Sequence, residues 1–318
     1  MTDPMELIDH FKLMLTMRHF EEACLDGVPT REIHGELHTG IGQEAISAAM
    51  AGILLKDDAL VSTHRNHLHA IAKGVSLKPL LAEIFERETG LCKGRGGHMH
   101  PFDPATNFSA TGIVGSAIPV ALGYSYAYFL ESSNNIAVGV AGDGAVNTGA
   151  FHESMNIAGA WKLPLVIVVE NNQYAISVKT DSVSATSSIA ERASAYACWG
   201  KSVDGTDVSK VIPLFEEAVD HARSGKGPAI LEATCYRFRG HYEGDHDSYR
   251  PNEEKATAIK DEDPILITRE QLIATGTVTA NDLDEMEDES KIFMTALLTE
   301  VREDPMPDPA DVGKYLFL

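Results

Sequence analysis

The sequence predicts an α/β fold, a mostly parallel sheet with helices on both faces. Two uninterrupted apolar runs, residues 136–141 and 164–170, indicate strands, because strands without polar alternation are buried on both faces, as in parallel sheets. Between them lie four apolar residues at helical spacing: Phe151, Met155, Ala158 and Trp161. Residues 136–170 therefore predict a strand–loop–helix–strand unit, the right-handed crossover of α/β proteins.

The chain before this unit predicts further elements in order. A helix is expected over residues 4–26, where four apolar residues recur at three- and four-residue spacing: Leu7, Phe11, Met14 and Leu15. A second helix is expected from Gln43 to Leu55, then a short strand over Ala59–Thr63. Residues 90–112 are rich in glycine and polar side chains and predict a long loop, of a length that usually serves a function. A helix of small residues is expected from Gly112 to Leu130.

The C-terminal region has a different pattern. Residues 251–264 are polar, and residues 281–303 predict an acidic amphipathic helix with five apolar residues turned inward: Leu283, Met286, Phe293, Leu297 and Val301. The proline-rich tail, residues 304–318, ends in apolar residues that indicate a partner surface. We expect one domain over residues 1–318, with a C-terminal helix and tail in 265–318 that pack on partner subunits.

Composition excludes several classes of protein. The chain has 318 residues, 44% apolar and 23% charged, which is ordinary for a globular protein. Its net charge of −21 argues against a nucleic-acid partner, because phosphate backbones repel such a surface. Without an 18-residue apolar run or a basic segment leading into one, we expect no membrane span and a cytoplasmic or organelle-matrix location. The four cysteines form no CxxC pair, which predicts reduced core thiols.

Polar residues follow both strands of the central unit. Asp143 stands between two glycines after the first strand, and Asn172 follows the second. The carboxyl ends of parallel strands bind ligands, so these side chains are expected to lie close together. Two such oxygen ligands and a turn carbonyl suit Mg²⁺, which prefers phosphate oxygens as partners. The backbone N–H groups of Gly144 and Ala145, opening the next helix, would face a diphosphate.

A dinucleotide site is the competing interpretation of the same turn. Gly142-Asp143-Gly144 nearly begins a GxGxxG motif, and Glu170 ends the second strand where a ribose-binding acid would stand. However, Asn147 replaces the third glycine, and an aspartate in the turn would repel a pyrophosphate that carries no metal. The metal–diphosphate interpretation explains Asp143, whereas the dinucleotide interpretation does not.

Thirteen histidines raise the question of a zinc site. His64, His67 and His69 are close in sequence, but this spacing does not put three ligands on one helix face, and no cysteine or carboxylate completes a tetrahedron. His241 lies between Gly240 and an acidic stretch with few apolar neighbours, so packing does not explain it and a functional role is expected. His98 and His100, in the glycine-rich loop, are expected to be ordering residues rather than catalysts. For His38, a structural and a functional role both stay open.

The motifs resemble a known family. The segment GDGAVNTGAFHESMNIAGAWKLPLVIVVENNQYAIS (142–177) contains the thiamine diphosphate motif and is similar to the α subunit of the E1 component of 2-oxo acid dehydrogenase complexes. Six further motifs fall in that family's order: GQEA (42–45), STHRNHLHAIAKG (62–74), GRGGHMH (94–100), GIVGSAIPVALG (112–123), RGHYEGDHDSYR (239–250) and PMPDP (305–309). The resemblance covers roughly residues 10–310.

This resemblance implies the thiamine diphosphate-binding fold, in which this chain forms the diphosphate-binding half. It implies three Mg²⁺ ligands: Asp143, Asn172 and the carbonyl of Tyr174. It implies further cofactor contacts, on the diphosphate by Gly142, Gly144, Ala145, His64 and Arg65, and on the aminopyrimidine by Gly112 and Val114. His64 departs from the tyrosine of the family pattern, whereas Arg65 supplies the bidentate charge that phosphate favours. His241 matches the family's active-site histidine on a mobile loop.

The implied function is the α subunit of a pyruvate or acetoin dehydrogenase E1, which cleaves next to a carbonyl and passes the acyl unit to a lipoyl group on an E2 acyltransferase. Glu44 and Glu170 are not expected to activate the pyrimidine ring, so a β subunit is expected to supply that glutamate, most simply in an α₂β₂ assembly. The form RGHYEGD resembles acetoin members, and Tyr242 stands where regulated members carry a phosphorylated serine. Three alternatives stay open: a branched-chain 2-oxo acid dehydrogenase, a carboligase or transketolase-like subunit, and a non-enzymatic subunit.

Overall fold

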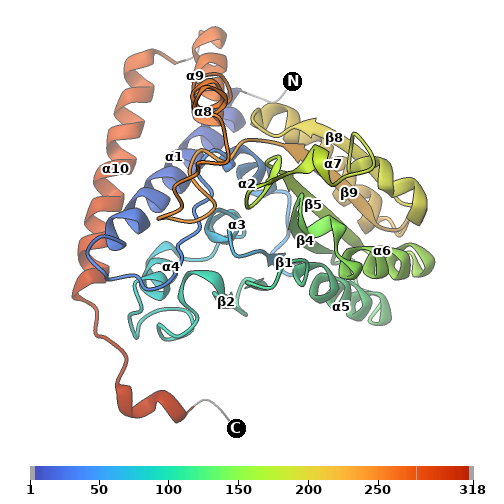
Figure 1. The fold of residues 1–318 in the computed structure, drawn as a ribbon, viewed down its shortest axis with the longest axis horizontal. Helices are drawn as coiled ribbons and strands as arrows, with labels where there is room; N and C mark the ends of the chain where they lie inside the picture. The colour runs from blue at the N-terminus through green and yellow to red at the C-terminus, as the bar shows by residue number, and fades with distance from the viewer. Residues whose placement is uncertain (1–3, 277, 315–318) are drawn as a thin grey trace.

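The structure, a computed structural model, describes residues 4–276 and 278–314 (Figure 1). Its main sheet contains seven strands among these residues: β1 (Ala59–Ser62), β2 (Phe102–Asp103), β3 (Phe108–Ala110), β4 (Ala137–Gly142), β5 (Leu165–Asn171), β8 (Trp199–Asp204) and β9 (Ala229–Thr234). They lie in the order β2-β3-β1-β4-β5-β9-β8, and every pair is parallel except β2–β3. Strands β6 (Tyr174–Ala175) and β7 (Val178–Lys179) pair separately. The predicted, mostly parallel sheet is confirmed.

Helices cover both faces of the sheet. The described helices are α1 (Pro4–Gly27), α2 (Glu44–Met50), α3 (His67–Ala72), α4 (Leu77–Ile84), α5 (Ala117–Leu130), α6 (Gly149–Trp161), α7 (Val208–Arg223), α8 (Asn252–Asp261), α9 (Pro264–Thr275) and α10 (Ala280–Glu303). Short 3₁₀ turns are η1 (Gly97–Met99), η2 (Ala145–Asn147), η3 (Thr180–Ser182), η4 (Ala190–Tyr196) and η5 (Pro309–Gly313). Helices α5 and α6 pack together on one side, and α2 packs with α7 on the other (Figure 1).

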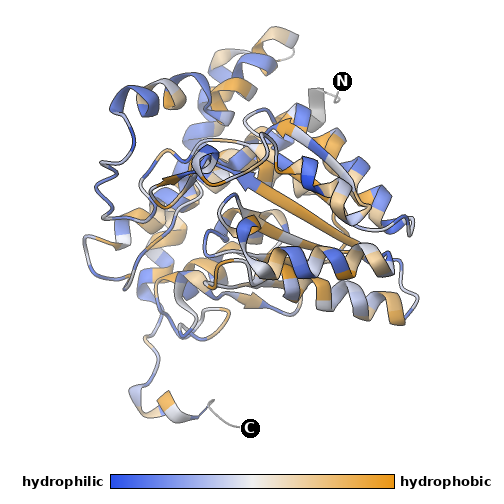
Figure 2. Ribbon diagram, turned by 45° about the vertical axis from the view of Figure 1, so that its right-hand side comes forward, coloured by the Kyte–Doolittle hydropathy of each residue, from blue (hydrophilic) through white to orange (hydrophobic). Residues whose placement is uncertain are grey.

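The central strands are apolar because both of their faces are buried. In β5, Val166 and Val168 join the core beneath α1, α2 and α7, whereas Ile167 and Val169 join the core beneath α5 and α6. Figure 2 shows the same strands as the hydrophobic centre of the molecule. Alternate side chains therefore fill two separate cores, which accounts for the unbroken apolar runs of the sequence.

Most elements expected from the sequence are confirmed, and two helices are shorter than predicted. The helix expected over Gln43–Leu55 ends at Met50, because Ala51 has extended backbone angles and Gly52 has a φ of +79°. The helix expected from Gly112 begins at Ala117, after Gly115 with a φ of +81°. The predicted loop 90–112 also contains β2 and β3, which are too short to show an alternating pattern.

One residue predicted to face inward does not, and one apolar residue of the helical pattern in α6 is exposed. Trp161, predicted only to lie at helical spacing, closes α6 and is 51% exposed. Phe293 is 52% exposed, and the neighbouring Met294 takes the buried position in α10 at 2%. The remaining apolar residues predicted inward on α10 are buried or packed against the core: Leu283, Met286, Leu297 and Val301. The polar residues 251–264 form α8 and the start of α9.

The C-terminal elements pack on the N-terminal helix of the same chain. Helices α9 and α10 both lie against α1, and the tail continues beside the segment after α4, where Glu88 donates a backbone hydrogen bond to Pro305 at 2.9 Å. The predicted packing of residues 265–318 on partner subunits stays a prediction, and residues 315–318 lie outside the described residues.

The structure also bears on the predicted core thiols and on the expectation of no membrane span. All four cysteines are free. Cys24 and Cys235 are buried, and the half-buried Cys198 packs against the core beneath α5 and α6, but Cys92 is half-buried outside both cores, so the prediction of a core position is wrong for Cys92. Within the described part of the chain, no helix combines the length and the apolar character needed to cross a membrane.

Gly159 in α6 is expected to tolerate no side chain. A Cβ at this position would lie 2.1 Å from the backbone oxygen of Tyr196 in η4, so Gly159→Ala should lower the free energy of unfolding by about 2–3 kcal/mol. Gly123→Ala in α5 is the matched control, because its Cβ would meet no atom within 4 Å, and it should be neutral or stabilise by up to about 1 kcal/mol. Urea unfolding of both variants measures the difference, and equal midpoints would contradict this account.

Candidate active site

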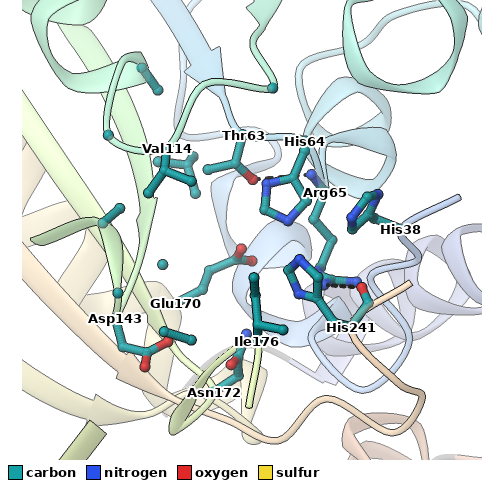
Figure 3. A pocket seen from close by; sticks show the side chains of 18 of the residues that line it. His38, Thr63, His64, Arg65, Val114, Asp143, Glu170, Asn172, Ile176 and His241 are labelled. Carbon is teal, nitrogen blue, oxygen red and sulfur yellow. Dashed lines mark hydrogen bonds between the residues drawn. The ribbon is translucent and has the colours of Figure 1, made fainter. Parts of the chain in front are cut away.

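A cavity of about 470 Å³ lies at the carboxyl edge of the sheet, beyond β1, β4, β5 and β9 (Figure 3). Its size falls in the range of small-molecule sites. The structure brings into this cavity every residue that the sequence singled out for cofactor or metal: His64, Arg65, Gly112, Val114, Gly142, Asp143, Gly144, Ala145, Asn172, Tyr174 and His241. These residues come from five segments, and only the parallel sheet puts them on one edge.

Asp143 and Asn172 follow neighbouring strands. Gly142 at the end of β4 pairs with Glu170 in β5, so the two residues after these strand ends meet at the same edge. Asp143 is 2% exposed, its carboxylate accepts a hydrogen bond from the Thr180 hydroxyl, and burial raises the pKa of this carboxyl group. The Asn172 amide donates to Gln43 at 3.1 Å, which leaves its oxygen turned toward the backbone N–H of Tyr174. The edge therefore offers two buried oxygen ligands.

The turn after β4 requires glycine at position 144 but not at position 142. A Cβ on Gly144 would lie 2.5 Å from the Cβ of Ala175, so only glycine fits between the two turns. At Gly142 a Cβ would meet no atom within 4 Å, so the backbone there borders open space. The sequence predicted that the N–H groups of Gly144 and Ala145 open a helix. They instead open the 3₁₀ turn η2, and α6 begins only at Gly149, with Thr148 as its N-cap.

Arg65 joins the end of β1 to the loop that carries His241. Its guanidinium donates to the carbonyl oxygen of Thr39 and, at 2.9 Å, to that of His241. Burial, with the nearby Arg237, lowers the pKa of Arg65 to about 9, so the group stays cationic at neutral pH. A fixed cation therefore stands on the wall of the cavity opposite Asp143 (Figure 3).

Arg237 is a cavity residue that the sequence analysis did not single out. It is 1% exposed and donates to the carbonyl oxygens of Tyr174 at 3.4 Å and Ile176 at 3.3 Å, and to the Tyr249 hydroxyl at 2.9 Å. Tyr249 in turn donates to Asp245, which accepts from the backbone N–H of His241. The Tyr174 carbonyl, predicted to bind metal, keeps a second lone pair beside this hydrogen bond. The sequence feature that could have pointed to Arg237 is its position shortly after β9 and before the His241 loop.

Four histidine rings gather on the Arg65 side of the cavity. The ring centroids of His38 lie 4.5 Å from His64, 4.9 Å from His241 and 5.3 Å from His98. Burial, with Arg65 nearby, lowers the pKa of His64 to about 2 and that of His241 to about 4, and burial likewise lowers that of His98 to about 3 and that of His38 further still. All four rings are therefore neutral at pH 7.

The other two histidines of the HxxHxH segment turn away from His64. His67 is completely buried and bonds to Glu21 at 2.8 Å, and Glu21 also accepts the backbone N–H of Gly40. His69 bonds to Ser62 at 2.9 Å and lies 3.2 Å from the carboxylate of Glu170. The three residues thus have separate environments, as expected from their spacing.

The two glutamates considered as pyrimidine activators have different positions. Glu44 is completely buried at the start of α2, where it pairs with Arg18 and accepts the backbone N–H of Gly42. This is the structural role expected from the sequence. Glu170 lines the cavity on the Asp143 side, at the end of β5 (Figure 3).

The neutral histidines predict a specific acid sensitivity. An unfolded imidazole titrates near pH 6.5, whereas the folded His64 stays neutral to about pH 2. Below pH 6.5 the unfolded chain therefore binds more protons, and stability falls as pH falls. His64→Gln should remove about 1 kcal/mol of the stability lost between pH 7.5 and 5.5. Thermal unfolding at stepped pH measures this, with the exposed His246→Gln as control. Parallel curves for wild type and His64→Gln would contradict it.

Comparison with known proteins identifies the family. The family model described as "Dehydrogenase E1 component" matches residues 12–310. The subunit alpha of the acetoin:2,6-dichlorophenolindophenol oxidoreductase of Bacillus subtilis (strain 168) is 36% identical over 303 residues, 95% of this chain and 90% of the relative. The pyruvate dehydrogenase E1 component subunit alpha of Rhizobium meliloti (strain 1021) is 35% identical over 309 residues, 97% of this chain and 89% of the relative.

A plant relative also matches nearly the whole of this chain but is itself covered less completely. The pyruvate dehydrogenase E1 component subunit alpha-3, chloroplastic, of Oryza sativa subsp. japonica is 33% identical over 323 residues, 98% of this chain and 76% of the relative. The family match contains both the glycine turn and the His241 loop, and it favours the metal–diphosphate interpretation of Asp143 over the dinucleotide one. The chain belongs to the dehydrogenase E1 component family, whose enzymes use thiamine diphosphate.

Proposed function

We propose that this chain is the α subunit of a thiamine diphosphate-dependent pyruvate or acetoin dehydrogenase E1. One observation carries the proposal: all the residues that match the family's cofactor motifs line one cavity at the carboxyl edge of the sheet. The α subunits of both kinds of enzyme are 35–36% identical to it over nearly its full length. The sequence identity to the acetoin enzyme and to the pyruvate enzyme differs by only one percentage point, so sequence identity does not decide between acetoin and pyruvate as the substrate.

The residues present suit a diphosphate held through Mg²⁺. Asp143 and Asn172 offer oxygen ligands, and the Tyr174 carbonyl offers a third, which is the ligand chemistry of Mg²⁺. Gly142, Gly144 and Ala145 bring backbone close to the anion, and Arg65 balances its charge. A cation beside Asp143 would also stabilise a carboxylate whose pKa is raised by burial. Gly112 and Val114 lie on the cavity wall where the pyrimidine side of the cofactor would extend.

The thiazolium ring of bound thiamine diphosphate would supply the nucleophilic carbon and the electron sink. This chain would contribute orientation and proton handling. His241, neutral at pH 7, has a buried Nδ1 with no hydrogen-bond partner among the described residues, so it can orient the substrate or exchange a proton with it. An anion bound beside it would raise its pKa toward neutral values, which suits a proton donor. His64 would lie on the same side.

A partner subunit completes this proposal. Glu44 is tied to Arg18 away from the cavity, so we infer that a β subunit supplies the glutamate that activates the pyrimidine, in an α₂β₂ assembly. Residues 265–318 are proposed to pack on partner subunits, with exposed Phe293 and Ile292 available on α10. A lipoyl-bearing E2 acyltransferase is the proposed acyl acceptor.

The test is a calorimetric titration of the chain, co-expressed with its β-type partner. Thiamine diphosphate is expected to bind with micromolar or better affinity when Mg²⁺ is present and much more weakly with EDTA. NAD is the control ligand and should not bind. Turnover of pyruvate, acetoin and branched-chain 2-oxo acids, with and without a lipoyl acceptor, then separates the dehydrogenase from a carboligase. Absence of Mg²⁺-dependent binding in the assembled pair would overturn the proposal.

A further inference from the structure

We propose that His38, His64 and His241 form a binding site for a transition-metal ion of the Zn²⁺ class, distinct from the oxygen site at Asp143. One ring nitrogen of each residue lies within 4.8 Å of those of the other two. The residues come from three separate segments: the loop before α2, the end of β1 and the loop after β9. Figure 3 shows the three rings together beside Arg65, across the cavity from Asp143.

The ring nitrogens are available for coordination. His38 Nδ1, His64 Nε2 and His241 Nδ1 are buried and have no hydrogen-bond partner among the described residues. Buried nitrogens without partners are costly, and a metal ion satisfies several of them at once. A metal ion binds the unprotonated ring nitrogen of an imidazole, which is the atom that each of these three residues leaves without a partner within the described part of the chain.

The geometry needs only a small adjustment. Tetrahedral Zn²⁺ with Zn–N bonds near 2.0–2.1 Å places its nitrogen ligands about 3.3 Å apart. From separations of up to 4.8 Å, each ring would move inward by roughly 1 Å, within reach of side-chain rotation. Three imidazoles with an open fourth position form a ligand set known from catalytic zinc sites, and the fourth position would face the cavity.

Local charge sets the affinity below that of a structural zinc site. Arg65 and Arg237 are the cations whose charges act on the rings of His64 and His241. Asp245, which raises the pKa of His241, and Glu36 and Glu170 on the cavity wall oppose them. Mg²⁺, a hard cation that prefers oxygen, would not compete for three nitrogens. The ion expected here is therefore a borderline transition metal held reversibly.

The consequence is inhibition by zinc. This part rests on the proposed function, in which His64 and His241 face the cofactor diphosphate. A metal ion that draws these rings together would withdraw both from that role and place a second cation in the cofactor's volume. Zn²⁺ and thiamine diphosphate with Mg²⁺ are therefore expected to weaken each other's binding.

Co²⁺ titration of the full-length chain tests the site, because four-coordinate Co²⁺ has intense visible bands that its octahedral complexes lack. One Co²⁺ per chain should give such a band, and Zn²⁺ should abolish it. His38→Gln and His64→Gln should each weaken Co²⁺ binding about 100-fold or more, since even groups that only support a ligand are worth about 10–100-fold. Asp143→Ala and the exposed His246→Gln are controls that should keep the band.

Two results would overturn the site. One is a band of wild-type affinity in both His38→Gln and His64→Gln when these variants retain wild-type melting temperatures. The other is loss of the band in Asp143→Ala but not in the histidine variants, which would place the ion at the oxygen site. The spectrum needs no thiamine diphosphate, so failure of cofactor binding in the calorimetric test would leave it interpretable. A band unaffected by saturating thiamine diphosphate with Mg²⁺ would refute the inhibition.

Discussion

Asp143→Ala is expected to abolish Mg²⁺-dependent binding of thiamine diphosphate and to lower turnover by the assembled enzyme by at least about 100-fold. Loss of a group that only supports a metal ligand costs about 10–100-fold in affinity or activity, so loss of a direct ligand should cost no less. Asp143 is buried at the end of β4, beside Asn172 and the glycine turn. Asp181, in the following turn η3, cannot replace it, because Asp181 is exposed and pairs with Lys179.

Calorimetry and turnover of the co-expressed pair measure this effect. Asp181→Ala is the matched control, since it removes an acid from the next turn without entering the cavity, and it should bind the cofactor normally. Asp143→Asn keeps the shape and one oxygen and should fall between wild type and alanine. The alanine variant should remain folded, because its main loss is one hydrogen bond from Thr180. Normal Mg²⁺-dependent binding by a folded Asp143→Ala would refute the ligand assignment.

The candidate site could be predicted from the sequence because its residues follow strands. Asp143 and Asn172 are each adjacent to an apolar run, and the rule that parallel strands end at one edge brings them together without knowledge of any loop. Arg237 also follows a strand, β9, but its role could not be predicted from that position. Its partners are the carbonyls of Tyr174 and Ile176 and the hydroxyl of Tyr249, and no sequence pattern records which distant carbonyls a buried guanidinium meets.

The helix faces were harder to predict where two apolar residues are adjacent. Phe293 and Met294 both fit the amphipathic pattern of α10, and a rotation of about 100° decides which of them is buried. Packing of α10 against α1 selects Met294. Trp161 is the last residue of α6, where the helix has already passed the edge of the core. Tertiary contacts, rather than periodicity, set both outcomes.

The role of the glycine-rich loop 90–97 could not be predicted from its composition. Its composition resembles a phosphate-binding loop, but the anion that it surrounds belongs to the chain. Glu83, in α4 and completely buried, accepts the backbone N–H groups of Cys92 at 2.6 Å, Gly94 at 2.9 Å, Gly96 at 2.6 Å and Gly97 at 3.2 Å. A Cβ on Gly90 would lie 2.5 Å from this carboxylate, and one on Gly96 would lie 2.6 Å from the His100 oxygen. The glycines therefore allow the loop to close around Glu83.

Glu83→Ala is expected to lower the free energy of unfolding by about 3–5 kcal/mol. Four partly buried N–H groups would lose their acceptor at once, and each unsatisfied group costs about 1–3 kcal/mol where water cannot replace the bond. Glu83→Gln should lose less, because its amide oxygen can still accept two of the four N–H groups while its NH₂ group faces the other two. Urea unfolding measures both, and Glu88→Gln, an exposed acid just beyond α4, should change stability by less than about 0.5 kcal/mol.

Loss of the Glu83 carboxylate should also affect cofactor binding in the cavity. The loop leads directly into η1, where the His98 carbonyl accepts the Asn66 amide at 2.8 Å and Met99 lines the cavity. Without the Glu83 carboxylate, hydrogen exchange of residues 92–100 is expected to speed up, and the His98 ring loses its fixed place against His38. Because a loose wall next to the diphosphate groups lowers affinity without removing a ligand, the Glu83 variants should bind thiamine diphosphate more weakly yet still require Mg²⁺. If exchange in this loop matches wild type, the glycines must be held by something other than Glu83.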